Sequence, residues 1–149
     1  GNGSIHYTLT YNDDPVAVLS LSRNGQDVYD INRYSTSCNV RGGFTRLLTA
    51  FERDYVPLRI DTFASLDYGY GNMYLSNGFD FVHVTQPNYK YFTWELDELD
   101  RHQCQKQKLA KWLPTFDCNM TERQNMDYAG FIRVHDCGSI KYTKMYEER

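Results

Sequence analysis

Alternation of apolar and polar residues at the start of the chain, followed by helical spacing, most strongly constrains the fold. Residues 5–11 follow a period of two and predict a strand, residues 16–21 beyond the turn at 12–15 are its predicted hairpin partner, and residues 28–34 are a third predicted strand. The next segment carries apolar residues at the spacing of one helical face, namely Phe44, Leu47, Leu48 and Phe51. A sheet with a helix packed on it is therefore expected, which is an α+β arrangement.

The rest of the chain continues this order in its first part and then changes character. Strands are predicted at 58–63, 79–84 and 89–94, with a short helix within 69–77 that ends at Gly78. Residues 97–112 and 121–129 are expected to be helical, and short strands are expected around 132–134 and 140–142. We predict one domain over residues 1–149, with a mixed or antiparallel central sheet in a core of 1–96 and a helical-plus-strand extension of 97–149.

Charge is unevenly distributed along the 149 residues, although the net charge is only −3. Residues 1–100 hold 7 Lys and Arg against 13 Asp and Glu, whereas residues 101–149 hold 9 against 6. The overall acidity argues against a nonspecific nucleic-acid coat but permits cations gathered on one face. No stretch approaches the roughly 18 apolar residues of a membrane span, so a cytoplasmic protein without membrane contact is expected.

Cysteine, histidine and acidic residues are the side chains that a metal or nuclease site would require. The four cysteines lack a regular framework and fit reduced, buried thiols better than disulfides. His102 with Cys104 and His135 with Cys137 offer four zinc-type ligands, but their spacing does not match common zinc sites. A nuclease needs clustered acids around a metal, and the sequence shows none. We therefore predict no metal and no cofactor.

Basic and aromatic residues instead favour nucleic acid as the partner. Cations recur between residues 101 and 111 at spacings that place several on one side of the predicted helix, where they can neutralise phosphates; a solvated amphipathic helix is the alternative. The predicted phosphate contacts are Arg41, Arg46, Arg101, Lys106, Lys108 and Lys111. The polar and aromatic stretch after residue 67 supplies the side chains most suited to approach bases, namely Tyr68, Tyr70 and Asn72.

Two segments resemble motifs of GNAT acetyltransferases. Residues 72–79 are similar to the motif Tyr-x-x-x-Gly-Phe, in which the tyrosine, here Tyr74, can act as a general acid. In that family the pyrophosphate of coenzyme A lies on a loop similar to Gln/Arg-x-x-Gly-x-Gly/Ala. Counted from Arg41, the two glycines fall at Phe44 and Arg46, whose side chains are expected to block a pyrophosphate. An acetyl-CoA-dependent acyltransferase with Tyr74 as the acid is therefore the alternative function.

An ordered series of residues from about Cys38 to Tyr142 resembles the GNAT-like domain at the C-terminus of many phage homing endonucleases. The series has six parts along the chain. These are Gly42-Gly43 with Leu47-Leu48; Gly71-Asn72-x-Tyr74 with Gly78-Phe79; Pro87-Asn88-Tyr89-x-Tyr91; Arg101 with Gln105-Lys106-x-Lys108-Leu109; Thr121-Glu122 with Met126 and Gly130; and Asp136-Cys137-Gly138.

The resemblance implies a double-stranded DNA-binding domain of GNAT-like fold. In the family, this domain addresses the nuclease to its site. Because this chain carries no nuclease part, the resemblance implies a phage-satellite type of transcriptional repressor that occupies a promoter or operator in an infected bacterial cell. We accordingly expect a protein that is not an enzyme, and a doubled half-site would be bound by a homodimer.

Overall fold

The computed structural model describes residues 3–147 and divides the chain into two compact units. The main unit comprises Gly1–Thr85 and Ser139–Arg149, and the inserted unit comprises Gln86–Gly138. The predicted division at residue 96 differs from these boundaries. Among residues 3–147, no helix combines the length and apolar character that a membrane crossing requires.

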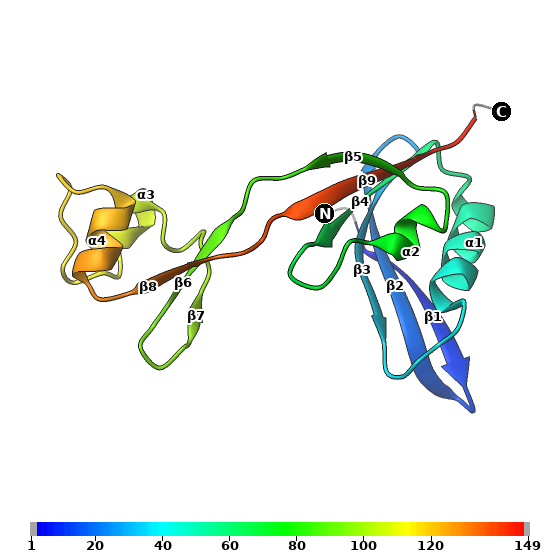
Figure 1. Ribbon diagram of the computed structural model, residues 1–149, viewed down its shortest axis with the longest axis horizontal. Coiled ribbons are helices and arrows are strands. Elements are labelled where there is room, and N and C mark those ends of the chain that lie inside the picture. Colours follow the sequence, from blue (N-terminus) through cyan, green and yellow to red (C-terminus); the bar gives the residue numbers. More distant parts are fainter. Residues whose placement is uncertain (1–2, 148–149) are drawn as a thin grey trace. The chain divides into compact units, whose positions relative to one another are not determined.

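A six-stranded sheet forms the main unit, in the order β1-β2-β3-β4-β9-β5 (Figure 1). Neighbouring strands are antiparallel except β3 and β4, which are parallel and joined by a helix, α1. The elements are β1 Ile5–Tyr11, β2 Asp14–Gly25, β3 Val28–Thr36, α1 Gly43–Tyr55, β4 Arg59–Ser65, α2 Asn72–Leu75, β5 Asp80–Val84 and β9 Ser139–Met145. The predicted α+β architecture is confirmed.

Helix α1 covers one face of this sheet and supplies much of its core. The predicted apolar face is confirmed, since Phe44, Leu47, Leu48 and Phe51 are all buried. In β2 the alternate residues Ala17, Leu19 and Leu21 are buried against it. Burial of one large apolar side chain contributes about 1.5–3 kcal/mol, so this face accounts for the packing of α1.

Strands β3 and β4 are paired only near their starts and then separate. Parallel pairing covers Val28–Asp30 against Arg59–Asp61, and no pairing follows, although β3 continues to Thr36 and β4 to Ser65. The register of β3 against β2 also skips Asn32, which produces a bulge in β3. The carboxyl ends of both strands therefore open at one edge of the sheet, where α1 and α2 begin.

The inserted unit has its own sheet and its own core. Its strands are β6 Tyr89–Phe92, β7 Glu98–Leu99 and β8 Ile132–His135, in the order β7-β6-β8. Two helices accompany them, α3 Lys106–Leu109 and α4 Glu122–Tyr128. The fully or nearly buried side chains of this core are Tyr91, Cys104, Leu109, Leu113 and Met126. This unit therefore has a hydrophobic cluster separate from that of the main unit.

Two strands are placed differently from the predicted core and extension. Strand β9, expected in the extension, lies in the main sheet between β4 and β5, whereas β6, expected in the core, belongs to the inserted unit. Strand patterning shows that a segment is extended but does not show which strand it will pair with. The predicted extension, residues 97–149, therefore contributes to both units: residues 97–138 belong to the inserted unit and β9 belongs to the main unit.

The predicted helix over 97–112 is wrong, because only α3 within this segment is helical. The Asp100 carboxylate accepts a hydrogen bond from the backbone N–H of His102, and the N–H of Gln103 donates to the Asp100 carbonyl. These bonds form a turn that competes with a helix at this point. The two buried residues of the segment, Cys104 and Leu109, are five positions apart, a spacing that one helical face does not give.

All four cysteines are free thiols, and Cys104 alone among them is buried. The prediction of buried thiols is therefore wrong for the three that are exposed, namely Cys38, Cys118 and Cys137. Burial, with the nearby Glu122 and Asp100 carboxylates, raises the pKa of Cys104 to about 11. Burial and Glu122 also raise the pKa of Tyr91 to about 12. Two acidic groups of the same core therefore resist ionisation.

We expect the inserted unit to lose stability as pH rises from about 9 to 11. The unfolded thiol ionises near pH 9 and the folded one near 11. Folding is thus favoured by the neutral thiol below pH 9, and this contribution is lost as pH rises through the folded pKa. Urea unfolding at pH 7.5, 9 and 10.5 measures the effect. Cys104→Ala should flatten the decline and Cys38→Ala should not; equal declines in both variants would exclude Cys104 as the cause.

Candidate nucleic-acid interface

The cations of the chain fall into two groups, those paired with carboxylates and those without such a partner. The paired cations are Arg23, Arg53, Arg59, Lys90, Arg123, Lys141 and Lys144. Within residues 3–147, none of the six predicted phosphate contacts has an ion pair with a carboxylate. Their charge is therefore not neutralised locally and is available to an external anion.

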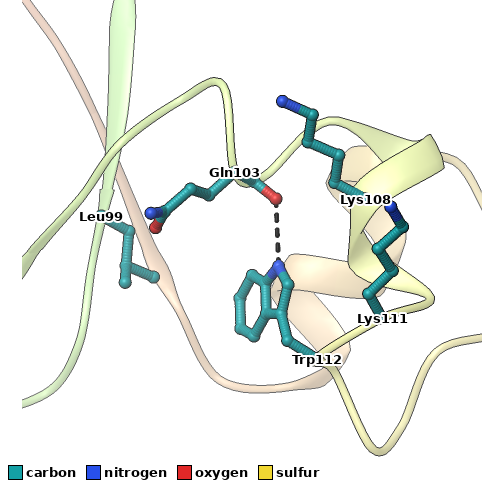
Figure 2. Close-up of a pocket in the computed structure, with 5 residues that line it drawn as sticks. All are labelled: Leu99, Gln103, Lys108, Lys111 and Trp112. Atoms are coloured by element: carbon teal, nitrogen blue, oxygen red, sulfur yellow. Dashed lines mark hydrogen bonds between the residues drawn. The ribbon is translucent and has the colours of Figure 1, made fainter.

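Lys108 and Lys111 line a surface hollow of about 410 Å³ in the inserted unit, together with Leu99, Gln103 and Trp112 (Figure 2). The half-buried Lys108 donates through Nζ to the imidazole of His102, 3.0 Å from Nε2. Lys106 lies exposed at the start of α3. The structure therefore brings Lys108 and Lys111 together at one hollow, although the long helix expected to align the cations is absent.

Arg101 lies beside a second cation that the sequence analysis missed, Arg133. Both guanidinium groups lie over the ring of Tyr89, with their Cζ atoms 4.4 Å and 5.0 Å from its centroid. The Tyr89 hydroxyl donates to Glu122 Oε1 at 2.9 Å, and Arg101 also donates to the Asn88 side chain. A fixed aromatic ring thus orients two cations. The sequence feature that could have indicated Arg133 is its position as the one charged residue within the otherwise apolar strand at 132–134.

In the main unit, Arg41 and Arg46 lie at the start of α1. Both are exposed, and both line a hollow of about 280 Å³ that also includes Cys38. Gly42 precedes the helix with a positive φ of 65°, which glycine adopts without steric cost. The first turn of α1 has no acidic residue, and its N–H groups at Gly43 and Phe44 are bonded to the Val40 carbonyl and to the Tyr34 hydroxyl. The two arginines and the positive end of the helix dipole therefore favour an anion here.

Tyr68, Tyr70 and Asn72 lie where β4 leads into α2. Tyr68 is 94% exposed and Tyr70 is 72% exposed, so neither ring contributes to the core. The loop itself is anchored, because the Tyr142 hydroxyl donates to the Tyr70 carbonyl at 2.5 Å. A side chain at Gly71, which has φ 72°, would lie 2.7 Å from the Tyr142 ring. A fixed backbone thus presents two free aromatic rings.

The interior of this sheet edge is filled by aromatic side chains around Tyr74. The Tyr74 ring is 9% exposed and contacts Phe44, Phe79 and Tyr142, with centroids 5.5, 5.5 and 5.7 Å away. Phe44 points into this core and packs against Tyr34, so its ring does not cover the start of α1. The expectation that the Phe44 side chain blocks a pyrophosphate is therefore wrong. The exposed Arg46 remains at that helix start.

The main-unit residues of the predicted site thus gather at the carboxyl ends of β3 and β4, since Phe44 at the start of α1 contacts Tyr74 of α2. The cations at 101–111 belong to the inserted unit. Within residues 3–147, no group of three or more His, Cys, Asp or Glu side chains forms a candidate metal site.

Comparison with solved structures identifies the architecture. The chain superposes on an aminoglycoside 6'-acetyltransferase type Ii with a TM-score of 0.55 and 14% identity, covering 98% of this chain and 71% of that one. The chain has the GNAT acetyltransferase fold. A GNAT family acetyltransferase from Elizabethkingia anophelis with bound acetyl-CoA gives a TM-score of 0.52 at 11% identity, covering 95% and 75%. The IAA acetyltransferase of Bacillus cereus gives 0.54 at 11% identity, covering 96% and 78%.

No protein-family model matches the sequence, and no curated protein matches it significantly. The structural likeness confirms the predicted GNAT-like fold class. It also overturns the prediction that the chain is not an enzyme, because four confidently matched structures are acetyltransferases. At 10–14% identity, the likeness defines an acyltransferase fold, and the chemistry of this chain rests on its own residues.

Proposed function

We propose that the protein binds double-stranded DNA at a specific sequence and represses transcription by occupying a promoter. The resemblance to the DNA-binding domain of phage homing endonucleases suggests this function. The observation that carries it is that, among the described residues 3–147, the six predicted phosphate contacts have no carboxylate partner, whereas seven other cations do. A structural cation is usually neutralised within the fold, but a DNA-binding cation must stay available for phosphate.

The predicted contacts comprise cations, which suit DNA phosphates, and hydroxyl or amide side chains, which suit base edges. Phosphate contacts fix the position of a protein on the duplex without reading sequence. The exposed Tyr68, Tyr70 and Asn72 carry hydroxyl and amide groups that hydrogen-bond with base edges. Binding that uses all six cations should weaken with salt at a slope of about −5.4 in log K against log salt concentration.

Mobility shift with fragments of a phage genome tests this proposal. Salt of about 150 mM suppresses nonspecific phosphate binding, and a parallel incubation with magnesium detects cleavage. We expect one fragment to shift discretely and to remain uncut. Equal affinity for all fragments, or no shift at all, would refute sequence-specific binding, and cleavage of the shifted fragment would refute repression by occupancy.

A second candidate function is acyl transfer from acetyl-CoA, and the geometry at the start of α1 favours it. The strands β3 and β4 separate there, and a side chain at Gly42 would meet no atom within 4 Å. Arg41 and Arg46, with the positive end of the helix dipole, suit a pyrophosphate, and the ring of Tyr74 contacts Phe44 of the same helix start. Acetyl-CoA would supply the activated acyl group.

For this candidate, calorimetry should detect coenzyme A binding that depends on the two arginines. We expect Arg41→Gln with Arg46→Gln to weaken binding about tenfold, because each arginine offers a charge-assisted contact to phosphate. Arg53→Gln is the matched control, since Arg53 lies in the last turn of the same helix and pairs with Asp54. Absence of binding to the unmodified protein would remove acetyl-CoA as a substrate.

A further inference from the structure

The hollow beside Lys108 and Lys111 has properties beyond those of a phosphate contact. Its volume of about 410 Å³ lies in the range of small-molecule sites, about 300–1,000 Å³. Figure 2 shows the indole of Trp112 at its centre, with Leu99 to one side and the two lysines to the other. The hollow thus combines an apolar wall with two cations, whereas phosphate alone requires no apolar wall.

Trp112 is held in place and still partly open. Its Nε1 donates to the Gln103 carbonyl at 3.0 Å, and its ring makes an edge contact with Phe131 at a centroid distance of 6.0 Å. The residue nevertheless remains 39% exposed. Because the polar group of the indole is already bonded, its open surface is suited to an apolar or aromatic ligand. A fixed ring also loses little conformational entropy when such a ligand stacks on it.

The two lysines define the charge of that ligand. Lys108 lies in α3 and Lys111 in the turn that follows, where the Lys111 N–H donates to the Lys108 carbonyl at 3.0 Å and keeps the two residues on one turn. Neither pairs with a carboxylate within residues 3–147, and Lys108 is oriented by its bond to His102. An anionic group beside Trp112 would therefore meet two ammonium groups at the rim of an aromatic surface.

We propose that this hollow binds one nucleotide, with its base against Trp112 and Leu99 and its phosphate between Lys108 and Lys111. The nucleotide comes either from DNA, as a base turned out of the stack, or from free nucleotide in solution. The first source rests on the proposed DNA-binding function, and the second does not. Stacking on an aromatic ring tolerates every base, so the hollow would add affinity more than sequence preference.

Trp112 fluorescence tests the proposal directly. The chain has two tryptophans, so Trp94→Phe leaves Trp112 as the single indole reporter; Trp94 is exposed. We expect saturable quenching by dAMP, weaker binding of deoxyadenosine, and no quenching by inorganic phosphate. Lys108→Gln with Lys111→Gln should weaken dAMP binding about tenfold, whereas Arg123→Gln, which removes a paired cation of the same unit, should not. If neither dAMP nor a short single strand quenches Trp112, the assignment is wrong.

A duplex carrying 2-aminopurine separates the two sources of the nucleotide. A change in the emission of the probe on binding that Trp112→Leu abolishes would assign the hollow to a base from DNA, because leucine keeps an apolar side chain at this position but offers no ring for stacking. A duplex that shifts in a gel while neither fluorophore responds would overturn this assignment and leave the DNA-binding proposal intact. Saturation by dAMP without any duplex shift would contradict the DNA-binding proposal, support the nucleotide site and identify free nucleotide as its ligand.

Discussion

Glutamine at the four predicted phosphate contacts of the inserted unit is expected to lower affinity for target DNA on the order of 10³-fold at about 150 mM salt. The four are Arg101, Lys106, Lys108 and Lys111. Each contact releases condensed counterions and contributes about 0.9 to the salt slope, so their removal should reduce that slope by about 3.6. Mobility shift at several salt concentrations measures both quantities.

The control variant has the same change in net charge, but its substitutions are at cations that form ion pairs with carboxylates. Glutamine at Arg23, Arg53, Lys90 and Arg123 removes four positive charges that face Asp27, Asp54, Glu98 and Asp127. Exposed pairs of this kind contribute little to stability, so the control should fold. We expect its salt slope to stay within about one unit of the unmodified protein. Equal losses in both variants would mean that net charge, rather than these contacts, attracts DNA.

The sequence predicted elements whose signal is local. Helix α1 follows from the spacing of four apolar residues within one segment, and its structure confirms that face. The pairing of β9 with β4 has no such local signal, because residues as distant as Asp61 and Thr143 are register partners. Because β9 returns to the main sheet, residues 86–138 form a separate unit inserted between β5 and β9. No local sequence pattern indicates this insertion.

The candidate site shows the same contrast between local and distant information. Composition sufficed to select the cations between 101 and 111, although the helix expected to align them is absent. Arg133 was missed because its link to Arg101 runs through the ring of Tyr89, which comes from another strand. Phe44 was misjudged because motif spacing gives its position in the chain but not its orientation into the core. Orientation depends on partners such as Tyr34 and Tyr74.

Loss of the Asn125 side chain is expected to destabilise the inserted unit by about 3–5 kcal/mol. Asn125 is fully buried, and its Oδ1 accepts from the Asp117 N–H at 2.7 Å. Its Nδ2 donates to the carbonyls of Asp117 at 2.9 Å and Thr121 at 3.0 Å. The Asn125 side chain thus joins α4 to the preceding segment at Asp117 through hydrogen bonds. Asn125→Ala removes the side-chain partner of the Asp117 N–H and carbonyl, each costing about 1–3 kcal/mol, whereas the Thr121 carbonyl keeps its bond from the residue 125 N–H.

Hydrogen exchange monitored amide by amide separates this effect from general unfolding. In Asn125→Ala we expect the amides of β6 and α4 to lose protection, while those of β2 and α1 in the main unit retain it. Gln124→Ala is the matched control, because it removes the capping-box bond to the Thr121 N–H and should cost only about 1 kcal/mol. Equal loss of protection in both units would mean that they unfold as one. Selective loss, together with loss of DNA binding, would assign binding to residues 86–138.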